Sequence, residues 1–549
     1  MKETEFKTKH PGSVLFYGHQ SAQLFTREIE ESIKGALENN MVSSDNSLFP
    51  RGFVKASIPG HPWDDTCWTR DCGAFLRELA LWGYLDEACI ICEYLIEYVM
   101  HNPEGFYTYP ERFEGNEKGW GLEMDGTADI VTGMVRLLQR LPDEHSLKGK
   151  VYSFLSGEDS PVAFIVKKLG NDYLISGTGE FGGGWCVEGS WYNIVQNSLV
   201  RQSLLAFAEV EAEHGKDGNA EVLRGKAASL LDHILEYLVD PADGSWLWSI
   251  QPQTMKPDNA ALNIPHNRAT ASINGAGSAY ADAEGLEPLA ELWPGAPFTA
   301  ATLDKVYNRY PFRKEQFEKY GMCTFVDYDD TVPLPGYASW LSYCDCYAAQ
   351  TMILLDKTVL LDKVLNWIAA TTYMGGSPSA DFIQKLSMGA AEIDFNSPNS
   401  TFWFTERNFS PDYNGERDIG CGKLNLVNVA EPMKLARLML GIDDRYTETV
   451  TIIPRLPEAW KGFEARNWPI KTKEGVALAD ILFEKKPGGG YCLRIEIENG
   501  KSIPYLTIRF PDGKREKYNS VTGVLECMVG ADSISMSSSY TDIKRNKNI

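Results

Sequence analysis

The strongest constraint on the fold is a change in the spacing of apolar residues near residue 447. Up to about residue 440 they recur every three or four positions, which is typical of helices that bury one face. From about residue 448 the period falls to two, as in Leu493, Ile495 and Ile497, which indicates β-strands. The expected helical segments are 25–37, 75–82, 85–99, 130–138, 146–169, 200–208, 223–238, 271–293, 301–310, 341–355, 361–368 and a last one that ends near 440.

The connections between these helices are by turns short and long. Only Gly83 and Tyr84 separate the second helix from the third, whereas long links rich in Trp, Asp, Glu and Gly precede the second, fourth, sixth, eighth and twelfth. Helices joined in this way form hairpins, and six hairpins can close into a ring. We therefore predict a mainly α fold, with an (α/α)6 barrel (a six-hairpin toroid) over residues 1–447. A small C-terminal antiparallel β module with a polar tail is expected over 448–549, where it is compatible with a brace for the barrel and with a homodimer contact.

Charge and hydropathy exclude several classes of partner. The 75 acidic and 53 basic side chains give a net charge of -22, and no stretch rich in Lys and Arg offsets it, so nucleic acid is not expected as a partner. The first ten residues are polar, and no later stretch approaches the roughly 18 apolar residues of a membrane span. The sequence thus predicts a cytoplasmic protein that does not use a membrane.

The cysteines and glycines do not form a cofactor motif. Cys89 and Cys92, like Cys344 and Cys346, form close pairs inside apolar helical patterns, and neither pair is followed by a second Cys-x-x-Cys or by a suitably spaced His. The segment 177–182 has the glycine spacing of a dinucleotide loop but does not run directly into a helix. We therefore expect buried reduced thiols, no metal and no cofactor.

Four segments combine aromatic residues with carboxylates just before even-numbered helices. A ring of hairpins would bring them to one mouth, where aromatic faces stack on sugar C–H surfaces and charged groups bind hydroxyls. Single carboxylates at these positions could also serve only as helix caps. The pattern as a whole predicts an oligosaccharide or glycoside ligand. The segments are Trp68-Thr-Arg-Asp71, Trp120-Gly-Leu-Glu-Met-Asp-Gly126, Trp185-Cys-Val-Glu-Gly189 and Thr405-Glu-Arg-Asn-Phe-Ser-Pro-Asp-Tyr-Asn-Gly-Glu416.

In this order and at these junctions, the four segments resemble the six-hairpin glycosidases, particularly the glucoamylase family and its trehalase, glucosidase and rhamnosidase relatives. The resemblance implies a glycoside hydrolase that removes a terminal sugar by an inverting reaction, with an α-glucoside favoured and a rhamnoside or a uronide as alternatives. It also implies a set of sugar-binding residues at the mouth. These are Trp68, Arg70, Asp71, Trp120, Asp125 and Trp185.

The same resemblance implies two catalytic glutamates. The general acid of the family follows a Trp before the sixth helix, which indicates Glu188; because Cys186 stands where the family has its Glu, Glu180 is an alternative. The general base of the family lies in a Ser/Thr-Glu pattern before the twelfth helix, which indicates Glu406. Hydrolysis needs such a pair, one carboxylic acid for the leaving oxygen and one carboxylate on the other side of the sugar.

Two other functions remain open at this point. Helical toroids also carry unsaturated-uronyl hydrolases, uronidases, sugar epimerases and polysaccharide lyases, which rely on Asp, His or Tyr. None of the eight histidines lies in the four segments, which weakens a His-based epimerase. A sugar-binding protein that has lost its general acid is the other alternative, because Cys186 interrupts the family pattern.

Overall fold

The computed structural model describes most of the chain. The described residues are 11–46, 48–60, 64–99, 124–169, 174–177, 191–256, 275–305, 338–358, 361–362, 364–365, 368, 405–410, 415–446 and 448–530. For 338–342, 344, 405–410 and 415–423 the description is of the backbone.

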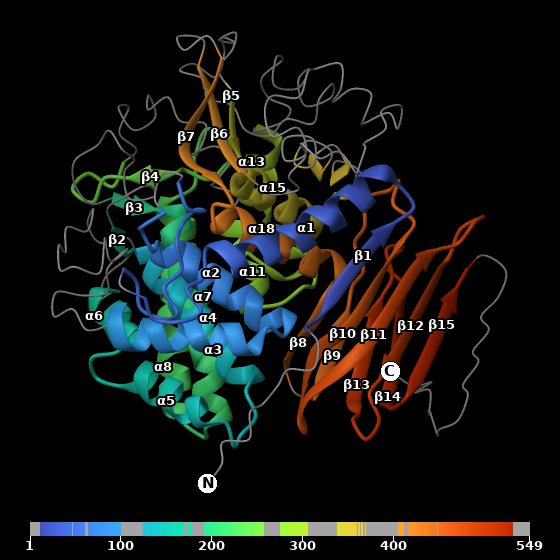
Figure 1. Cartoon of the computed structure of the whole chain (residues 1–549). Helices are drawn as coiled ribbons and strands as arrows, with labels where there is room; N and C mark the ends of the chain where they lie inside the picture. Colours follow the sequence, from blue (N-terminus) through green and yellow to red (C-terminus); the bar gives the residue numbers. More distant parts are fainter. Residues whose placement is uncertain are drawn as a thin grey trace.

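Six of the described helices lie side by side in a closed ring (Figure 1). Each contacts the next along the chain, and the last contacts the first again. This ring is what the inner layer of a six-hairpin toroid requires; the complete pairing of twelve helices stays a prediction. In chain order the ring consists of α2 (Thr69–Trp82), α4 (Met124–Arg140), α7 (Ile194–Glu213), α11 (Gly275–Ala283), α15 (Ser342–Leu354) and α18 (Val427–Leu440).

Further helices pack on the outside of this ring. Most are amphipathic and contact one or two ring helices, as α8 contacts α7 and α1 contacts α18. Gly83, with a φ of 85°, ends α2 and lets the chain turn directly into α3. The outer elements are α1 (Gln20–Asn39), α3 (Leu85–Tyr94) with a π-helical turn (Leu95–Val99), α5 (Ser146–Ser156), α6 (Pro161–Leu169), α8 (Asp217–Tyr237), α12 (Leu289–Leu292) and α13 (Ala296–Asp304).

Three helical predictions need correction. The segment 146–169 is two helices, because the chain turns after Ser156 and Pro161 starts a new helix at a position where proline loses no hydrogen bond. The segment 271–293 likewise contains α11 and the short α12, and the next helix is α13, which begins earlier than expected. Pro432 lies inside α18.

The β module consists of two sheets that share an aromatic core. One has the order β1-β10-β11-β12-β15 and the other β14-β13-β9-β8. The rings of Phe463, Phe483, Tyr491 and Phe510 follow one another at centroid distances of 5.6, 5.8 and 5.8 Å. The strands are β1 (Ser13–Tyr17), β8 (Ile442–Tyr446), β9 (Thr449–Ile452), β10 (Gly462–Thr472), β11 (Gly475–Lys485), β12 (Tyr491–Ile497), β13 (Ile503–Arg509), β14 (Arg515–Val521) and β15 (Val524–Val529).

The β module uses more of the chain than 448–549 and is not purely antiparallel. Its first sheet includes β1 from the beginning of the chain, which pairs with β10 from Ser13↔Arg466 to Tyr17↔Gly462. Its second sheet begins already at Ile442, and β13 pairs with β9 in parallel. The strand periodicity itself is confirmed, because Leu493, Ile495 and Ile497 are buried. A division of the chain at residue 447 remains a proposal.

Buried contacts join the β module to the base of the helical ring. Arg140 at the end of α4 lies 2.8 Å from Asp444 of β8, and both side chains are buried. The indoles of Trp82 and Trp468 meet at a centroid distance of 5.0 Å. The module therefore packs directly against the ring through buried side chains.

Two short sheets adjoin the other end of the ring. The sheet β5-β6-β7 comprises β5 (Ala338–Leu341), β6 (Thr405–Ser410) and β7 (Gly415–Lys423), and in Figure 1 it rises above the helices. The other sheet comprises β2 (Ser176–Gly177), β3 (Trp191–Asn193) and β4 (Ser249–Ile250). Because β5 runs into α15 and β3 into α7, both sheets lie where ring helices begin.

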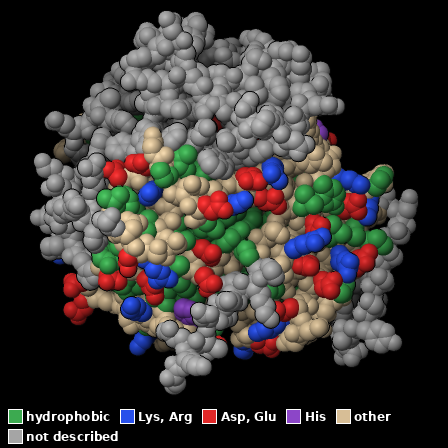
Figure 2. All heavy atoms as spheres, viewed as in Figure 1, with side chains coloured by type: hydrophobic (Ala, Val, Ile, Leu, Met, Phe, Trp, Pro, Cys, Tyr) green, Lys and Arg blue, Asp and Glu red, His purple; other side chains and the backbone are tan. Residues whose placement is uncertain are grey.

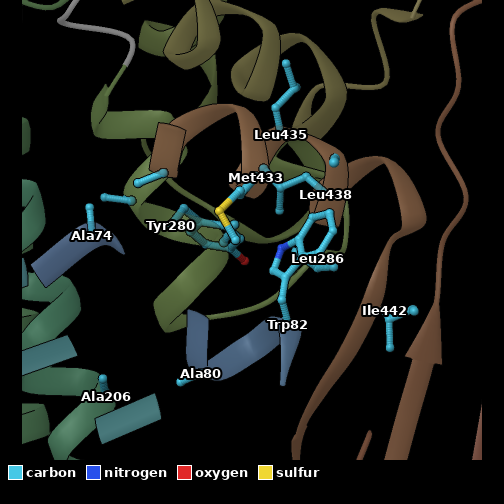
Figure 3. Close-up of a cluster of buried hydrophobic side chains, with 14 of the residues drawn as sticks. Ala74, Ala80, Trp82, Ala206, Tyr280, Leu286, Met433, Leu435, Leu438 and Ile442 are labelled. Carbon is cyan, nitrogen blue, oxygen red and sulfur yellow. The ribbon is translucent and has the colours of Figure 1, made fainter. Parts of the chain in front are cut away.

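The apolar core lies between the packed helices and between the ring and the β module. Figure 3 shows part of it, where Trp82, Tyr280, Met433 and Leu438 come together from α2, α11 and α18. On the described part of the face in Figure 2, acidic and basic side chains are interspersed. Within the described ranges, no helix is long and apolar enough to cross a membrane.

Candidate functional site

Three glycines bring the backbones of α2 and α4 into contact. A Cβ atom on Gly73 would lie 2.4 Å from the carbonyl carbon of Asp129, and one on Gly133 would lie 2.6 Å from the oxygen of Gly73. A Cβ on Gly126 would lie 2.2 Å from the Thr69 hydroxyl. A larger residue at these positions would push the helices apart, so the glycines fix how the side chains of α2 and α4 meet.

This close packing places Arg70 of α2 between two carboxylates. Its Nε lies 3.3 Å from Oδ1 of Asp71, and its Nη1 lies 3.5 Å from Oδ2 of Asp125. Asp71 and Asp125 are almost completely buried, and Arg70 is 9% exposed. Both carboxylates lie in the first turn of their helices, where the helix dipole favours negative charge.

Two residues from the starts of other ring helices complete this cluster. The guanidinium carbon of Arg70 lies 5.8 Å from the centroid of the Tyr343 ring, at the start of α15. The backbone N–H of Tyr343 donates to Oδ1 of Asn428 in the first turn of α18, at 2.7 Å. We refer to Arg70, Asp71, Asp125, Tyr343 and Asn428 as the mouth cluster.

A second set of polar side chains fills the ring below the mouth cluster. Arg77 lies 2.8 Å from Glu78, 3.4 Å from Asp129 and 3.1 Å from Glu431. Side chains from all six ring helices meet here, so the set occupies the inside of the ring. We call it the lumen network; it comprises Arg77, Glu78, Asp129, Gln202, Asp282, Gln350, Glu431, Lys434 and Arg437.

The two sets show that the ring helices run in the same direction. On α2, Arg77 follows Arg70 by seven residues, or about 10 Å along the axis. On α4, Asp129 follows Asp125 by one turn, and each arginine lies against the carboxylate at its own level. The N-terminal ends of the helices therefore share one end of the ring, which we call the mouth.

Burial and charge divide the acids of the lumen network into two kinds. Burial raises the pKa of Asp129 to about 8, although Arg77 opposes the shift, while Glu431 and Asp125 add to it. Glu78 is also buried, but Arg437 and Arg77 hold its pKa below the usual value. Asp129 thus keeps its proton at neutral pH. The basic side chains of the network, Arg77, Lys434 and Arg437, are then equal in number to its other acidic side chains, Glu78, Asp282 and Glu431.

The residues predicted from the sequence divide into three groups. Arg70, Asp71 and Asp125 lie together, and Trp68 is the partly buried residue before α2. Glu406 lies in β6, where the description is of the backbone. Trp120, Trp185, Glu188 and its alternative Glu180 lie outside the described residues.

The backbone near Glu406 belongs to the mouth of the ring. Glu406 pairs with Leu341 of β5, and partners in an antiparallel pair have Cα atoms about 5 Å apart. Leu341 is followed at once by α15, whose second residue is Tyr343 of the mouth cluster. Glu406 also pairs with Gly422 of β7, five residues before the start of α18.

Sequence reasoning missed Tyr343, Asn428 and the lumen network. One signal was present: charged residues recur at helical spacing inside otherwise apolar helices, as Arg77 follows Arg70 and Asp129 follows Asp125. Charged residues that recur in this way on a buried helix face predict oppositely charged partners on neighbouring helices, because unpaired charges are costly to bury. Asn428 carried no comparable signal.

The sequence matches no family model, and no curated protein is similar to it in sequence. Solved α-L-rhamnosidase structures are similar in fold at 12% identity: that from Aspergillus terreus has a TM-score of 0.54 and that from Dictyoglumus thermophilum 0.53. The α-L-rhamnosidase from Streptomyces avermitilis complexed with L-rhamnose has a TM-score of 0.50, also at 12% identity.

The similarity covers almost all of this chain but only part of the others. It extends over 96%, 94% and 94% of this chain and over 50%, 50% and 42% of the Aspergillus, Dictyoglumus and Streptomyces chains. This chain thus spans about half of the length of those rhamnosidases. The likeness confirms the resemblance to six-hairpin glycosidases at the level of the fold.

The mouth cluster has the chemistry of a site for a polyhydroxylated ligand. A buried guanidinium and two carboxylates can make charge-assisted hydrogen bonds to hydroxyls, and an aromatic ring lies beside them. The lumen network closes the ring below, so a ligand would enter from the mouth. Among the described residues, no group of three or more His, Cys, Asp or Glu side chains is arranged to hold a metal ion.

Proposed function

We propose that this chain is an exo-acting, inverting glycoside hydrolase that removes a terminal sugar from oligosaccharides or glycosides. The observation that carries the proposal is the buried Arg70–Asp71–Asp125 group at the mouth of a helical ring whose fold is similar to that of α-L-rhamnosidases. A lumen filled by the polar network favours an exo-acting enzyme, because the pocket would accept one end of a chain.

In the proposed reaction Glu188 is the general acid and Glu406 the general base. Glu188 gives its proton to the departing glycosidic oxygen while the C–O bond breaks, and Glu406 takes a proton from the water that attacks the anomeric carbon from the other side. The products are the free sugar with inverted configuration and the shortened alcohol. Arg70, Asp71 and Asp125 hold the hydroxyls of the terminal sugar.

Chain connectivity supports these two assignments. Glu406 lies in a strand that pairs with the residues just before α15 and shortly before α18. The segment that carries Glu188 leaves the described chain at Gly177 and rejoins it at Trp191, and these two residues pair just before α7 begins. Both glutamates thus belong to connections that end at the mouth.

The substrate is proposed as an α-glucoside, with an α-L-rhamnoside as the second candidate. The first follows from the resemblance of the sequence motifs to the glucoamylase family. The second is suggested by the solved structures of similar fold, which are α-L-rhamnosidases. The two candidates share the site and the reaction and differ in the sugar.

The test is hydrolysis of a panel of chromogenic glycosides that includes both candidates, by the wild type and by Glu406→Gln. The wild type is expected to release one of the two sugars with inverted configuration, as followed by NMR of the fresh product. Glu406→Gln is expected to lower kcat by about 10²- to 10⁴-fold without changing Tm, because the base is lost but the shape is kept. Glu416→Gln on β7 is the matched control and should keep full activity.

The same assay separates the alternatives. Glu188→Gln should abolish activity and Glu180→Gln should not; the reverse result would move the general acid to Glu180. Full activity in a folded Glu406→Gln protein would refute the mechanism. An epimer or an unsaturated product without hydrolysis would favour another carbohydrate enzyme, and binding without turnover would favour a sugar-binding protein.

A further inference from the structure

Asn428 lies on the face of α18 that looks into the ring. Three residues later on the same face comes Glu431, and three further comes Lys434, both members of the lumen network. Asn428 is therefore one turn above the network, at the level of the mouth cluster. Its side chain is completely buried.

The hydrogen bond to Tyr343 fixes the orientation of the Asn428 carboxamide. The backbone N–H of Tyr343 can only donate, so the atom that receives its bond at 2.7 Å is the amide oxygen. The amide nitrogen with its two hydrogens then faces the other way. Within the described part of the chain this nitrogen has no hydrogen-bond partner. A buried donor in this state is costly, so the position is suited to a ligand that supplies an acceptor.

The surroundings of this donor match a sugar hydroxyl. Asn428 accepts a hydrogen bond from Tyr343, whose ring lies against the guanidinium of Arg70. Arg70 in turn lies between Asp71 and Asp125. The cluster thus offers neutral and cationic donors, carboxylate acceptors and an aromatic face within one buried layer. A hydroxyl can accept from the amide and donate to a carboxylate, which a simple anion or an apolar group cannot do.

We propose that Asn428 is a substrate-binding residue whose amide N–H donates a hydrogen bond to a hydroxyl of the sugar held by Arg70 and Asp125. The proposal rests on the proposed function in that the ligand is a sugar, but it does not require hydrolysis. It adds a neutral donor from α18 to a site that the sequence motifs assigned to charged and aromatic residues.

The test is Asn428→Asp, which removes the amide N–H donor and keeps an oxygen that can accept a hydrogen bond. A carboxylate oxygen can still accept from the Tyr343 N–H, but the N–H donor is gone. The dissociation constants of D-glucose and L-rhamnose and the KM of any hydrolysed glycoside are expected to rise about 10- to 100-fold. Should this variant fail to fold, Asn428→Ala gives the same readout.

Asn193→Asp is the matched control. Asn193 is also completely buried at the start of a ring helix, its Oδ1 accepts from the N–H of Val195 at 2.7 Å, and its amide nitrogen has no partner among the described residues. It precedes α7 as the capping residue and lies outside the mouth cluster. Like Asn428→Asp, the control variant introduces a new buried carboxylate, so any general effect of that charge is present in both. Sugar binding by Asn193→Asp should equal that of the wild type.

The outcomes separate the two proposals. Hydrolysis with unchanged KM in Asn428→Asp, or an equal loss in Asn193→Asp, overturns the role of Asn428 and leaves the hydrolase proposal standing. A wild type that binds a sugar without hydrolysing it, together with weakened binding in Asn428→Asp, supports the role of Asn428 and refutes the hydrolase. A wild type that binds neither sugar and hydrolyses no glycoside overturns both.

Discussion

The mouth cluster and the lumen network use the same kinds of side chain at two levels of one ring, yet they differ in how many ring helices they join. In the lumen network Arg437 lies 2.9 Å from Glu78 and 2.7 Å from Asp282. At the mouth, Arg70 lies 3.3 and 3.5 Å from its two carboxylates, and the Asn428 amide nitrogen has no partner in the described chain. The lumen network thus links all six ring helices and the mouth cluster four of them, which fits a structural role below and the proposed ligand site above.

The sharpest way to break this comparison is to remove one arginine from each level. Arg77→Met would remove the guanidinium that lies 2.8 Å from Glu78 and 3.1 Å from Glu431, whose carboxylates are buried. Because unpaired buried charges are strongly unfavourable, we expect a loss of about 3 to 5 kcal/mol in the free energy of unfolding, measured by chemical denaturation. A loss below about 1 kcal/mol would mean that the network does not hold the ring together.

The matched change at the mouth is Arg70→Met. The loss of charge-assisted hydrogen bonds to the sugar is expected to lower kcat/KM about 10- to 100-fold. The free energy of unfolding should fall less than in Arg77→Met, because Arg70 is 9% exposed and Arg77 only 1%. If Arg70→Met destabilised the protein as much as Arg77→Met and left sugar binding intact, the two levels would share one structural role.

The dependence of stability on pH should sharpen the description of the lumen network. The pKa of Asp129 is about 8 in the folded protein, whereas an unfolded Asp titrates near 3.8. Between these values the folded state holds a proton that the unfolded state has released. Stability should therefore fall as pH rises, by about 1.4 kcal/mol per pH unit, and level off above pH 8.

Asp129→Asn should remove this pH dependence, because asparagine stays neutral. The measurement is the difference in unfolding free energy between the wild type and the variant at pH 5, 6 and 7. A difference that stays constant over this range would show that Asp129 is ionised throughout.

The sequence predicted the helices better than it predicted their partners. Apolar spacing marked the helices, although ring helices such as α2 and α18 are buried on every side, and Gly83 marked the end of α2. The split at Pro161 was missed because the apolar pattern continues through the break. The pairing of β1 with β10 and the parallel pairing of β9 with β13 join distant segments, and no local pattern specifies such contacts.

The candidate site was predictable where a motif combined charge with an aromatic residue. Trp68-Thr-Arg-Asp71 and Asp125-Gly126 indicated sugar contacts, and the structure brings Arg70, Asp71 and Asp125 together. Asn428 could not be found in this way, because its position depends on a hydrogen bond to Tyr343, on a different helix. A buried asparagine in a helix has no distinctive sequence pattern until the packing is known.

The pairing of β1 with β10 bears on how this protein is made in a cell. Strand β1 leaves the ribosome early, but its partner begins at Gly462. At about 5 to 20 residues per second, β1 must wait on the order of half a minute or more for that partner. During this time its backbone N–H and C=O groups lack the partner that they have in the folded protein and are open to pairing with other strands.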